Sequence, residues 1–355
     1  ERVAGATTDL QHMLHQGMSY YNATFWVGAN AVIRKEALED IVEVEVVGGF
    51  EIRTYIQDRT VIEDTESSVD LGTHGWSLVN YPERLSYSAT PPDFGSLVVQ
   101  RRRWANGGLL ILPKFWDQLG ARRLKRERVL LSEFLLRANY MASISWASFG
   151  LVLLLAYPFD GRLLSPFVLA AALPYFIAMG SDLRESGHRF SDILRIYGSN
   201  LVPLPLNTAG VVKSFQQMIT GEKIPFARTP KVKDRTAAPA IYVIVPYVIV
   251  AFSIFTLLRD IPEQNWGNVI FASFNALMAA GAIRAYIGIR NSFVDVWLGF
   301  LGWLHVPRKE KRKAQADLVD PSQPVNWEGI LYYGDRRLNR DLRGQRDRRR
   351  RIGIR

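Results

Sequence analysis

The sequence has no cysteine, and only five of its 355 residues are histidine. Without cysteine the chain forms no disulfide, offers no thiolate nucleophile and builds no cysteine-ligated zinc site. Since histidines are also scarce, we expect no structural zinc site.

Acidic residues are outnumbered by basic ones: 34 Asp and Glu stand against 44 Lys and Arg, a net charge of +10. Such a surplus is typical of a protein that meets nucleic acid, anionic lipid or a phosphorylated substrate. The arginines gather beside apolar segments instead of along an aromatic-studded polar face, so we expect no nucleic-acid partner. The chain starts at Glu1 without a signal peptide, and we expect it to be a piece of a longer protein.

Long apolar runs are missing from residues 1–130 and from the polar end, 306–355, and are confined to 138–305. Four runs approach the ~20 residues needed to cross about 30 Å of hydrocarbon. Buried helical hairpins in a soluble core are the alternative, but four such runs are hard to bury without lipid. The expected spans are residues 138–157, 163–180, 239–258 and 267–289.

Loop charges predict how these spans are oriented. Basic residues concentrate before the first span, between the second and the third, and after the fourth. The positive-inside rule then predicts that residues 1–137, 181–238 and 290–355 are in the cytoplasm.

Three further stretches are apolar without being clean spans. Residues 121–140 and 294–313 combine large apolar side chains with basic residues, which predicts helices lying on the membrane surface. Residues 192–221 are interrupted by prolines and glycines, which predicts a re-entrant or interfacial pair, with two additional short crossings as the alternative. The basic tail after residue 305 is predicted either to bind anionic lipid or to remain solvated.

The first 120 residues have the pattern of an α/β domain. Residues 25–27 and 76–83 are predicted strands, and a helix should follow the GAN turn near residue 34. Residues 95–108 predict a helix that ends at Gly107 and Gly108. Together these elements predict the latter half of an α/β domain, joined to a helical membrane bundle.

Two polar motifs in this domain are not needed for folding. Glu63 and Asp64 form an acid pair, and residues 100–104 read QRRRW. Alone, the acid pair would be typical of a helix start, where acids interact favourably with the helix dipole. Together with three arginines, it favours a site in which a carboxylate takes a proton and a guanidinium neutralises phosphate.

Helical spacing divides the QRRRW residues between two faces. Gln100 and Arg103 are three apart and can face one site, where Arg103 suits bidentate contact with a diphosphate. Trp104 offers a flat apolar surface for a sugar ring, with a core position as the alternative. Arg101 and Arg102 should point away from that site and pair with acids or lipid headgroups.

Four motifs, in chain order, resemble those of the membrane-embedded family 2 glycosyltransferases, which include cellulose, chitin and hyaluronan synthases. QRRRW resembles their QxxRW signature and IEDTESSVDLGTHGW (62–76) their acid-pair element. FWVGANAVIRKEAL (25–38) resembles their acceptor-side strand and finger helix, and PFARTPKVK (225–233) their gating-loop signature FxxTxK.

The resemblance implies a GT-A-like α/β catalytic domain, of which this chain holds the C-terminal half. The implied organisation is a cytoplasmic catalytic part at 1–120, an interfacial helix at 121–137, membrane and interfacial helices at 138–305 with a gating loop at 222–236, and a basic cytoplasmic tail at 306–355.

The resemblance also implies roles for individual residues. Asp64 is the expected base, and Glu63 beside it would orient a backbone group or a cation. The expected donor and diphosphate ligands are Gln100, Arg103, Phe226, Arg228, Thr229 and Lys231. The expected acceptor contacts are Trp104, Phe25, Trp26, Gly28, Ala29 and Asn30. A plain tight turn at 28–30 and a lipid-binding basic loop at 225–233 are the alternatives, and His74 is expected to be a structural turn residue.

The implied function is processive transfer of a sugar, most simply glucose from UDP-glucose, onto a growing β-glycan by an inverting mechanism coupled to export. The alternatives are a non-processive enzyme that adds one sugar to a lipid carrier, and a transporter, which the scarcity of charges inside the spans disfavours. Mg²⁺ or Mn²⁺ is expected on an upstream DxD motif that this chain lacks. Expected partners are the nucleotide sugar, the nascent polysaccharide and membrane lipid, with accessory subunits or a homo-oligomer left open.

Overall fold

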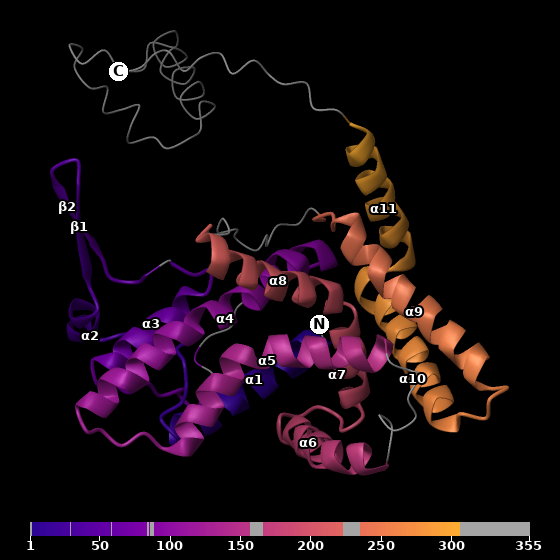
Figure 1. Ribbon diagram of the computed structural model, residues 1–355, viewed down its shortest axis with the longest axis horizontal. Helices are drawn as coiled ribbons and strands as arrows, with labels where there is room; N and C mark the ends of the chain where they lie inside the picture. Colours follow the sequence, from indigo (N-terminus) through magenta and orange to yellow (C-terminus); the bar gives the residue numbers. More distant parts are fainter. Residues whose placement is uncertain are drawn as a thin grey trace, which may run out of the picture. The chain divides into compact units, whose positions relative to one another are not determined.

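The computed structural model describes residues 2–28, 30–57, 59–83, 85, 89–156, 166–222 and 235–305, and Figure 1 shows that these form helices and one hairpin. The elements, in order, are α1 (Arg2–Tyr20), α2 (Lys35–Asp40), β1 (Glu43–Val47), β2 (Phe50–Thr54), α3 (Glu63–Thr73), α4 (Phe94–Leu124), α5 (Leu131–Ala156), α6 (Pro166–Glu185), α7 (Asp192–Leu201), α8 (Leu204–Thr220), α9 (Ala240–Asp260), α10 (Trp266–Ala282) with a π turn (Ile283–Ile287), and α11 (Ile289–Leu304).

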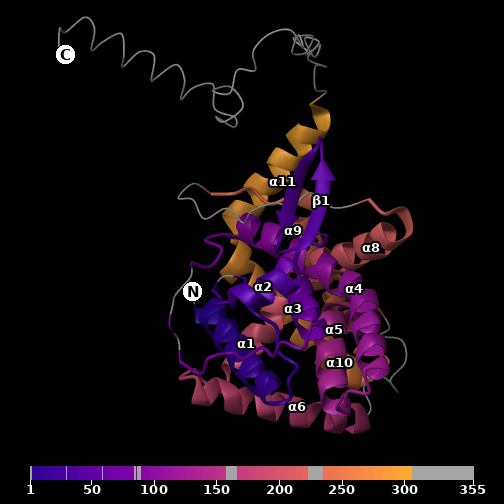
Figure 2. The same ribbon diagram turned by 90° about the vertical axis from the view of Figure 1, so that its left-hand side faces the viewer.

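β1 and β2 pair as an antiparallel hairpin, with Val47 opposite Phe50. Gly48 and Gly49, with φ of +60° and +85°, make the turn, and glycine is favoured there because both positions need positive φ. The hairpin extends away from the helices (Figure 2), and Phe50 is 76% exposed. It is the only sheet among the described residues, so they do not show the predicted GT-A-like α/β fold.

The two predicted strands are wrong, because side chains rather than neighbouring strands satisfy their backbone. The amide of Trp26, in the first segment, donates to the Ser68 hydroxyl at 3.0 Å. In the second segment, Asn80 N donates to the Ser19 hydroxyl at 2.8 Å. Val79 is 77% exposed, so this segment is not the buried strand that its apolar residues predicted.

α4 was predicted to end at Gly107 and Gly108, but it continues past them to Leu124. The glycines instead allow close packing. A Cβ on Gly107 would lie 2.3 Å from the Ile62 side chain, and one on Gly108 would lie 2.3 Å from the carbonyl oxygen of Met141. Contacts that close are sterically forbidden, so both positions require a residue without a side chain.

The predicted single helix at 121–140 is also wrong, because α4 and α5 are separated by a turn in which Arg126 has φ of +58°. Arg122 closes this turn through Nη1, which lies 2.6 Å from Glu133, and Nε, which lies 3.1 Å from Glu127. α5 therefore runs back alongside α4, as Figure 1 shows.

Among the residues that the structure describes, three helices are long and apolar enough to cross a membrane: α5, α9, and α10 with its π turn. They agree with the spans predicted at 138–157, 239–258 and 267–289, and they fit a membrane protein. The span predicted at 163–180 falls on α6, and its first residues lie outside the described ranges. α9 and α10 pack together as an antiparallel hairpin (Figure 1).

Residues 192–221 form two helices, α7 and α8, interrupted at Val202-Pro203. Whether this pair of helices re-enters the membrane, lies at its surface or crosses it stays a prediction. α8 lies along α4, where the Ser214 hydroxyl donates to the Asn106 carbonyl at 2.7 Å. α11 covers part of the helix predicted at 294–313, and the residues after 305 lie outside the described ranges.

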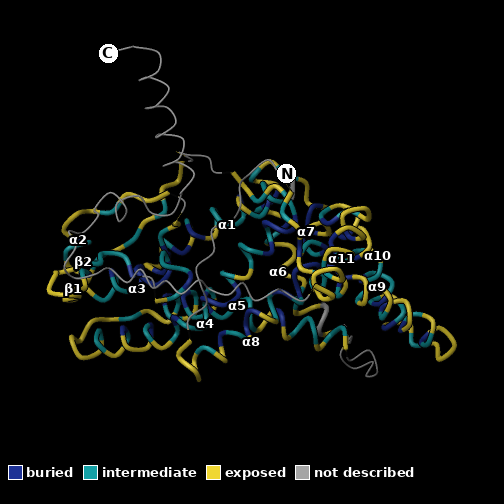
Figure 3. Tube along the Cα trace, turned by 90° about the horizontal axis from the view of Figure 1, so that it is seen from above, coloured by how far each residue is buried: buried dark blue, intermediate teal, exposed yellow. Residues whose placement is uncertain are grey.

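Two of the four apolar clusters among the described residues involve α4, and Figure 3 shows buried residues along α4, α5 and α8. One cluster joins the end of α1 to α3, α4 and α5, and consists of Met18, Ala23, Phe25, Val69, Ile111, Phe115 and Met141. The other joins the start of α4 to α8, α9 and the π turn, and includes Phe94, Val98, Leu206, Val243 and Ile287. α4 belongs to both, so it connects the acid pair to the membrane helices.

Candidate active site

The segment after α1 lies against the first turns of α3 and fixes the Asp64 carboxylate. Gly28 N donates to Asp64 Oδ2 at 3.0 Å. One turn further along α3, Ser68 accepts from Trp26 N at 3.0 Å and donates to the Asp64 carbonyl at 2.7 Å. A Cβ on Gly28 would lie 3.0 Å from Asp64 Oδ2, so a small residue is needed for this approach.

Asp64 is held from its own helix as well, because its Oδ1 accepts from Thr65 N at 2.8 Å. α3 begins at Glu63, so the acid pair does start a helix, as the simpler alternative predicted. The bond from Gly28 goes beyond that role, because it orients the carboxylate toward a segment 36 residues away in the chain. Oδ1 also accepts from the Thr65 hydroxyl at 3.4 Å, whereas Oδ2 accepts one bond, from Gly28 N, among the described residues, so Oδ2 can accept a further donor such as a hydroxyl.

Arg103 joins α4 to the start of α3. Its Nε and Nη2 donate to the Val61 carbonyl at 3.2 and 3.1 Å, and Nη2 lies 3.3 Å from Glu63 Oε2. The Arg103 and Glu63 side chains are 20% and 32% exposed, so the pair is partly shielded from water. The structure thus brings the acid pair and the QRRRW motif together through the Arg103–Glu63 ion pair, while the predicted role of Glu63 stays a prediction.

Arg101 was predicted to point away from the site and pair with an acid or a lipid headgroup, but it lies over Trp104. Its guanidinium carbon is 5.2 Å from the centre of the Trp104 ring, within the range of a cation–π contact. Burial lowers the pKa of Arg101. Arg102 is exposed, while Gln100 and Trp104 are half-buried. One side of the predicted sugar platform is therefore already occupied by Arg101.

Phe25 is a core residue and not an acceptor contact. It is 2% exposed, and its ring stacks on Tyr140 of α5 at 4.9 Å between centroids. The guanidinium carbon of Arg137 lies 5.7 Å from the same ring. The prediction is wrong because α5, distant in sequence, covers this side chain.

The other predicted acceptor residues lie in or near the turn that follows. Asn30 N donates to the Val27 carbonyl at 3.0 Å, which closes the turn, while Ala29 lies outside the described residues. Trp26 is half-buried beside Ala37 and Leu71. Of this group, only Gly28 contacts the acid pair directly among the described residues.

A buried histidine that the sequence did not mark supports the same segment. His15 is 1% exposed, and its Nδ1 lies 3.0 Å from the Thr24 hydroxyl, at the start of the segment that carries Gly28. Burial lowers the pKa of His15 to about 4, against the opposing effect of the Asp64 charge. His15 is therefore neutral at pH 7. No motif surrounds it, so only the packing of α1 identifies it.

A lysine on α4 provides a second polar link to α3. Lys114 Nζ lies 3.3 Å from Glu66 and 2.6 Å from Asp70. Burial raises the pKa of Asp70, and Lys114 opposes that shift. Glu66 and Asp70 are four residues apart and thus on one face of α3, a signal that could have predicted a cationic partner. His74 Nδ1 lies 3.0 Å from the Asp70 carbonyl, which agrees with a structural turn residue.

The predicted gating residues Phe226, Arg228, Thr229 and Lys231 lie outside the described residues. The residues that follow this loop are fixed to the start of α4. Thr236 N donates to Asp93 Oδ2 at 2.9 Å, while Asp93 Oδ1 caps α4 through Ser96 N at 2.7 Å. Arg235 Nη1 donates to Asp295 Oδ2 at 3.0 Å. The loop therefore returns to the helix that carries the QRRRW motif.

The family described as glycosyl transferase family group 2 matches residues 1–179. The chain belongs to this family. The match spans the acid pair, the turn at Gly28 and the QRRRW helix, and it ends before the predicted gating loop. The residues that the described contacts bring together therefore all lie within the part of the chain that matches the family.

The curated relatives of this family 2 chain include cellulose synthases. The cellulose synthase catalytic subunit [UDP-forming] of Komagataeibacter sucrofermentans is 28% identical over 199 residues, which are 53% of this chain and 24% of that protein. Cellulose synthase 2 of Novacetimonas hansenii is 27% identical over 199 residues, 53% of this chain and 11% of that protein. The chain thus spans a quarter or less of these relatives. No solved structure matches it.

The metal site is expected upstream of this chain, and nothing in the described residues of this family 2 chain tests that expectation. Among them, no group of three or more His, Asp or Glu side chains is arranged to hold a metal ion. Glu63 is paired with Arg103, and Asp64 accepts backbone donors. Binding of Mg²⁺ or Mn²⁺ at an upstream motif therefore stays a prediction.

Proposed function

We propose that the chain is part of a processive, inverting polysaccharide synthase that transfers glucose from UDP-glucose to a growing β-glycan. The observation that carries this proposal is the Asp64 carboxylate, oriented by Gly28 N at 3.0 Å beside the Arg103–Glu63 pair. An isolated acid pair would be a helix start. An acid pair joined to a guanidinium and to a tight turn has the composition of a transferase site.

In the proposed reaction, Asp64 takes the proton from the acceptor hydroxyl. The hydroxyl oxygen bonds to the anomeric carbon as the bond from that carbon to the diphosphate breaks, and UDP leaves with the negative charge. Single displacement inverts the anomeric configuration, so an α-linked donor gives a β-linked product. A general base in this position contributes roughly 10²–10⁴-fold to the rate.

Arg103 would stabilise the leaving diphosphate, and Glu63 would hold its guanidinium in place. Guanidinium is suited to this role because it stays charged and offers a planar set of donors. Gln100 and the loop residues Phe226, Arg228, Thr229 and Lys231 complete the proposed donor site. Trp104, Gly28 and Asn30 would border the acceptor. A divalent cation, held outside the described residues, would add charge neutralisation at the diphosphate.

The three candidate membrane helices support a coupling of synthesis to export. α4 contacts the acid pair through Arg103 and packs against α8 and α9 through the apolar cluster at its start. We propose that the site faces the cytoplasm of the inner membrane, and that the polymer leaves between the helices. Loop 222–236 would close over the donor and exclude water.

Replacement of the base tests the proposal. Asp64→Asn keeps the shape and the bond from Gly28 but cannot accept the proton, so polymer formation should fall about 10²–10⁴-fold. Binding of UDP, measured by calorimetry on the purified membrane protein, should persist. Asp117→Asn removes an exposed carboxylate on α4 and should leave the rate unchanged. Polymer synthesis by Asp64→Asn at the normal rate would refute the assignment.

The length of the product distinguishes this function from transfer of a single sugar to a lipid carrier. Incubation with radiolabelled UDP-glucose should give a high-molecular-weight product that a β-glucanase digests. A product of one sugar on lipid, with the same dependence on Asp64, would support the non-processive alternative.

A further inference from the structure

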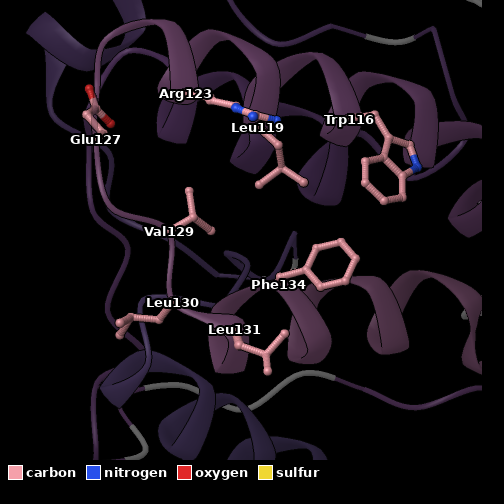
Figure 4. A pocket seen from close by; sticks show the side chains of 8 residues that line it. All are labelled: Trp116, Leu119, Arg123, Glu127, Val129, Leu130, Leu131 and Phe134. Carbon is pink, nitrogen blue, oxygen red and sulfur yellow. The ribbon is translucent and has the colours of Figure 1, made fainter.

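The corner between α4 and α5 encloses a cavity of about 420 Å³. Figure 4 shows Trp116 and Leu119 descending from α4 toward Phe134 of α5, with Val129 on the connecting turn and Arg123 at the same end as that turn. The volume is within the range of small-ligand pockets, roughly 300–1,000 Å³. None of these residues belongs to the proposed sugar site.

The walls of this corner groove are apolar and accessible. The Trp116 and Phe134 rings lie 5.4 Å apart between centroids, and Phe134 stacks on the buried Phe115 at 6.1 Å. Trp116 is 57% exposed and Leu131 is 71% exposed. Large apolar side chains gathered around an open cavity mark a place where an apolar ligand lowers the free energy by leaving water.

The turn at one end of the groove is basic, although the two charged residues that line the cavity itself are Arg123 and Glu127. Arg123, Lys125, Arg126 and Arg128 are all exposed, and none has an ion-pair partner in the part of the chain that the structure describes. Arg122 pairs with both Glu127 and Glu133, and the five basic and two acidic residues of 122–133 leave a net charge of +3 (5 − 2) at this corner. The positive charge at the mouth is therefore available to an external anion.

The groove also lies where a lipid would be found. Leu131, on its wall, is the first residue of α5, which is one of the three candidate membrane helices. The first turn of a membrane helix is at the level of the phospholipid headgroups, where Trp and Arg side chains are favoured. An apolar groove with a cationic mouth at this level complements an amphiphile that has one acidic headgroup.

We propose that the α4–α5 corner binds an anionic phospholipid. One acyl chain lies in the groove against Trp116, Leu119 and Phe134, and the phosphate lies at Arg123 and the basic turn. The ligand is a lipid and not a free phosphate, because the apolar lining of the groove would contact an acyl chain but would not stabilise an inorganic anion. The proposal is independent of sugar transfer, since it concerns only this corner.

Binding is measured on the full chain, purified in detergent and freed of native lipid. Phosphatidylglycerol and phosphatidylcholine are titrated separately, and bound lipid is counted by native mass spectrometry. Phosphatidylglycerol should bind more tightly than phosphatidylcholine. Arg123→Gln should weaken phosphatidylglycerol about fivefold, the effect expected for one cation near an anionic headgroup. Trp116→Ala should weaken both lipids, and Trp116→Phe should retain most of the affinity.

Arg184→Gln is the matched control, because it removes one exposed positive charge from the end of α6 and should leave binding unchanged. Equal loss in Arg184→Gln and Arg123→Gln would show general charge attraction and overturn the proposal. Equal affinity for the two lipids would overturn it too. So would full competition by inorganic phosphate, which would identify a simple anion site. None of these measurements needs a sugar donor, so they stand apart from the proposed function.

Discussion

The seam between α3 and α4 and the hairpin of α9 and α10 solve the packing of helices in opposite ways. In the seam, polar groups fix the geometry: Arg103 bonds the Val61 carbonyl at 3.1 Å, and Lys114 lies 2.6 Å from Asp70. In the hairpin, apolar side chains face outward, as in Leu258, which is 64% exposed. A buried Asn275 there bonds the Tyr197 hydroxyl at 2.6 Å.

The contrast reflects the two solvents. In water, apolar burial drives association, and polar bonds across the seam add orientation that a reaction centre needs. In hydrocarbon, each polar group must find its hydrogen-bond partner inside the protein, and exposing apolar side chains to the surroundings carries no free-energy penalty. The seam should therefore be sensitive to the loss of single polar groups, whereas the outer side of the hairpin should tolerate small changes.

Apart from the Asp64 replacement described above, the largest effect is expected at Arg103. Arg103→Gln removes the contact with Glu63 and the proposed diphosphate ligand, and should lower the initial rate of polymer synthesis about 100-fold, or about 2.7 kcal/mol in activation free energy. Arg102→Gln, one residue earlier and exposed, loses the same charge and should keep the normal rate. Equal rates for the two variants would remove Arg103 from the site.

A second test measures how stability depends on pH through His15, which contacts Thr24 at the start of the segment that carries Gly28. His15 has a pKa of about 4 in the folded protein and 6.5 in the unfolded chain. The unfolded chain therefore binds the proton first, and stability falls as the pH drops from 6.5 toward 4, by about 1.4 kcal/mol per unit. Between pH 6.5 and pH 5 the loss should be about 2 kcal/mol.

His15→Asn removes the titrating group. Thermal unfolding in detergent should then show a shallower loss of stability with falling pH than in the unmodified protein. Parallel pH profiles would mean that His15 titrates alike in both states, contrary to its burial.

The smallest effect is expected when the same substitution, glycine to alanine, is made once in α4 and once in α10. Gly107→Ala places a methyl group 2.3 Å from the Ile62 side chain and should destabilise the protein by about 1.5 kcal/mol. Gly281→Ala in α10 meets nothing within 4 Å, and should be neutral or slightly stabilising, by up to about 1 kcal/mol. Differential scanning fluorimetry of the two variants measures the difference. Equal shifts would show that α4 does not pack tightly against Ile62.

The membrane helices were predictable because an apolar run of sufficient length is a local property. Element ends were harder. Gly107 and Gly108 have the local pattern of a helix stop, yet they sit inside α4 because Ile62 and Met141, both distant in sequence, need the space. The hairpin at Gly48-Gly49 carried a known turn signal that was missed, since the residues around it also fit a helix.

The site was predictable where the chemistry of a residue decides its role. Gly28 lies against the acid pair because a glycine turn lets its backbone approach Asp64 closely, and Arg103 lies beside Glu63 because their charges are opposite. Phe25 was misplaced because its burial depends on Tyr140, 115 residues along the chain, which no local pattern reveals. Arg101 was misplaced because its attraction to Trp104 competes with pairing to an acid.

Asp93 has a consequence for engineering. Its two oxygens serve separate stretches of chain, one capping α4 at Ser96 and the other receiving Thr236, which comes after the loop. A chimera that transplants the arginine-rich helix alone would leave one of those amides without its acceptor. The helix and the segment from 235 onward therefore form a single exchangeable module, to be swapped between relatives together.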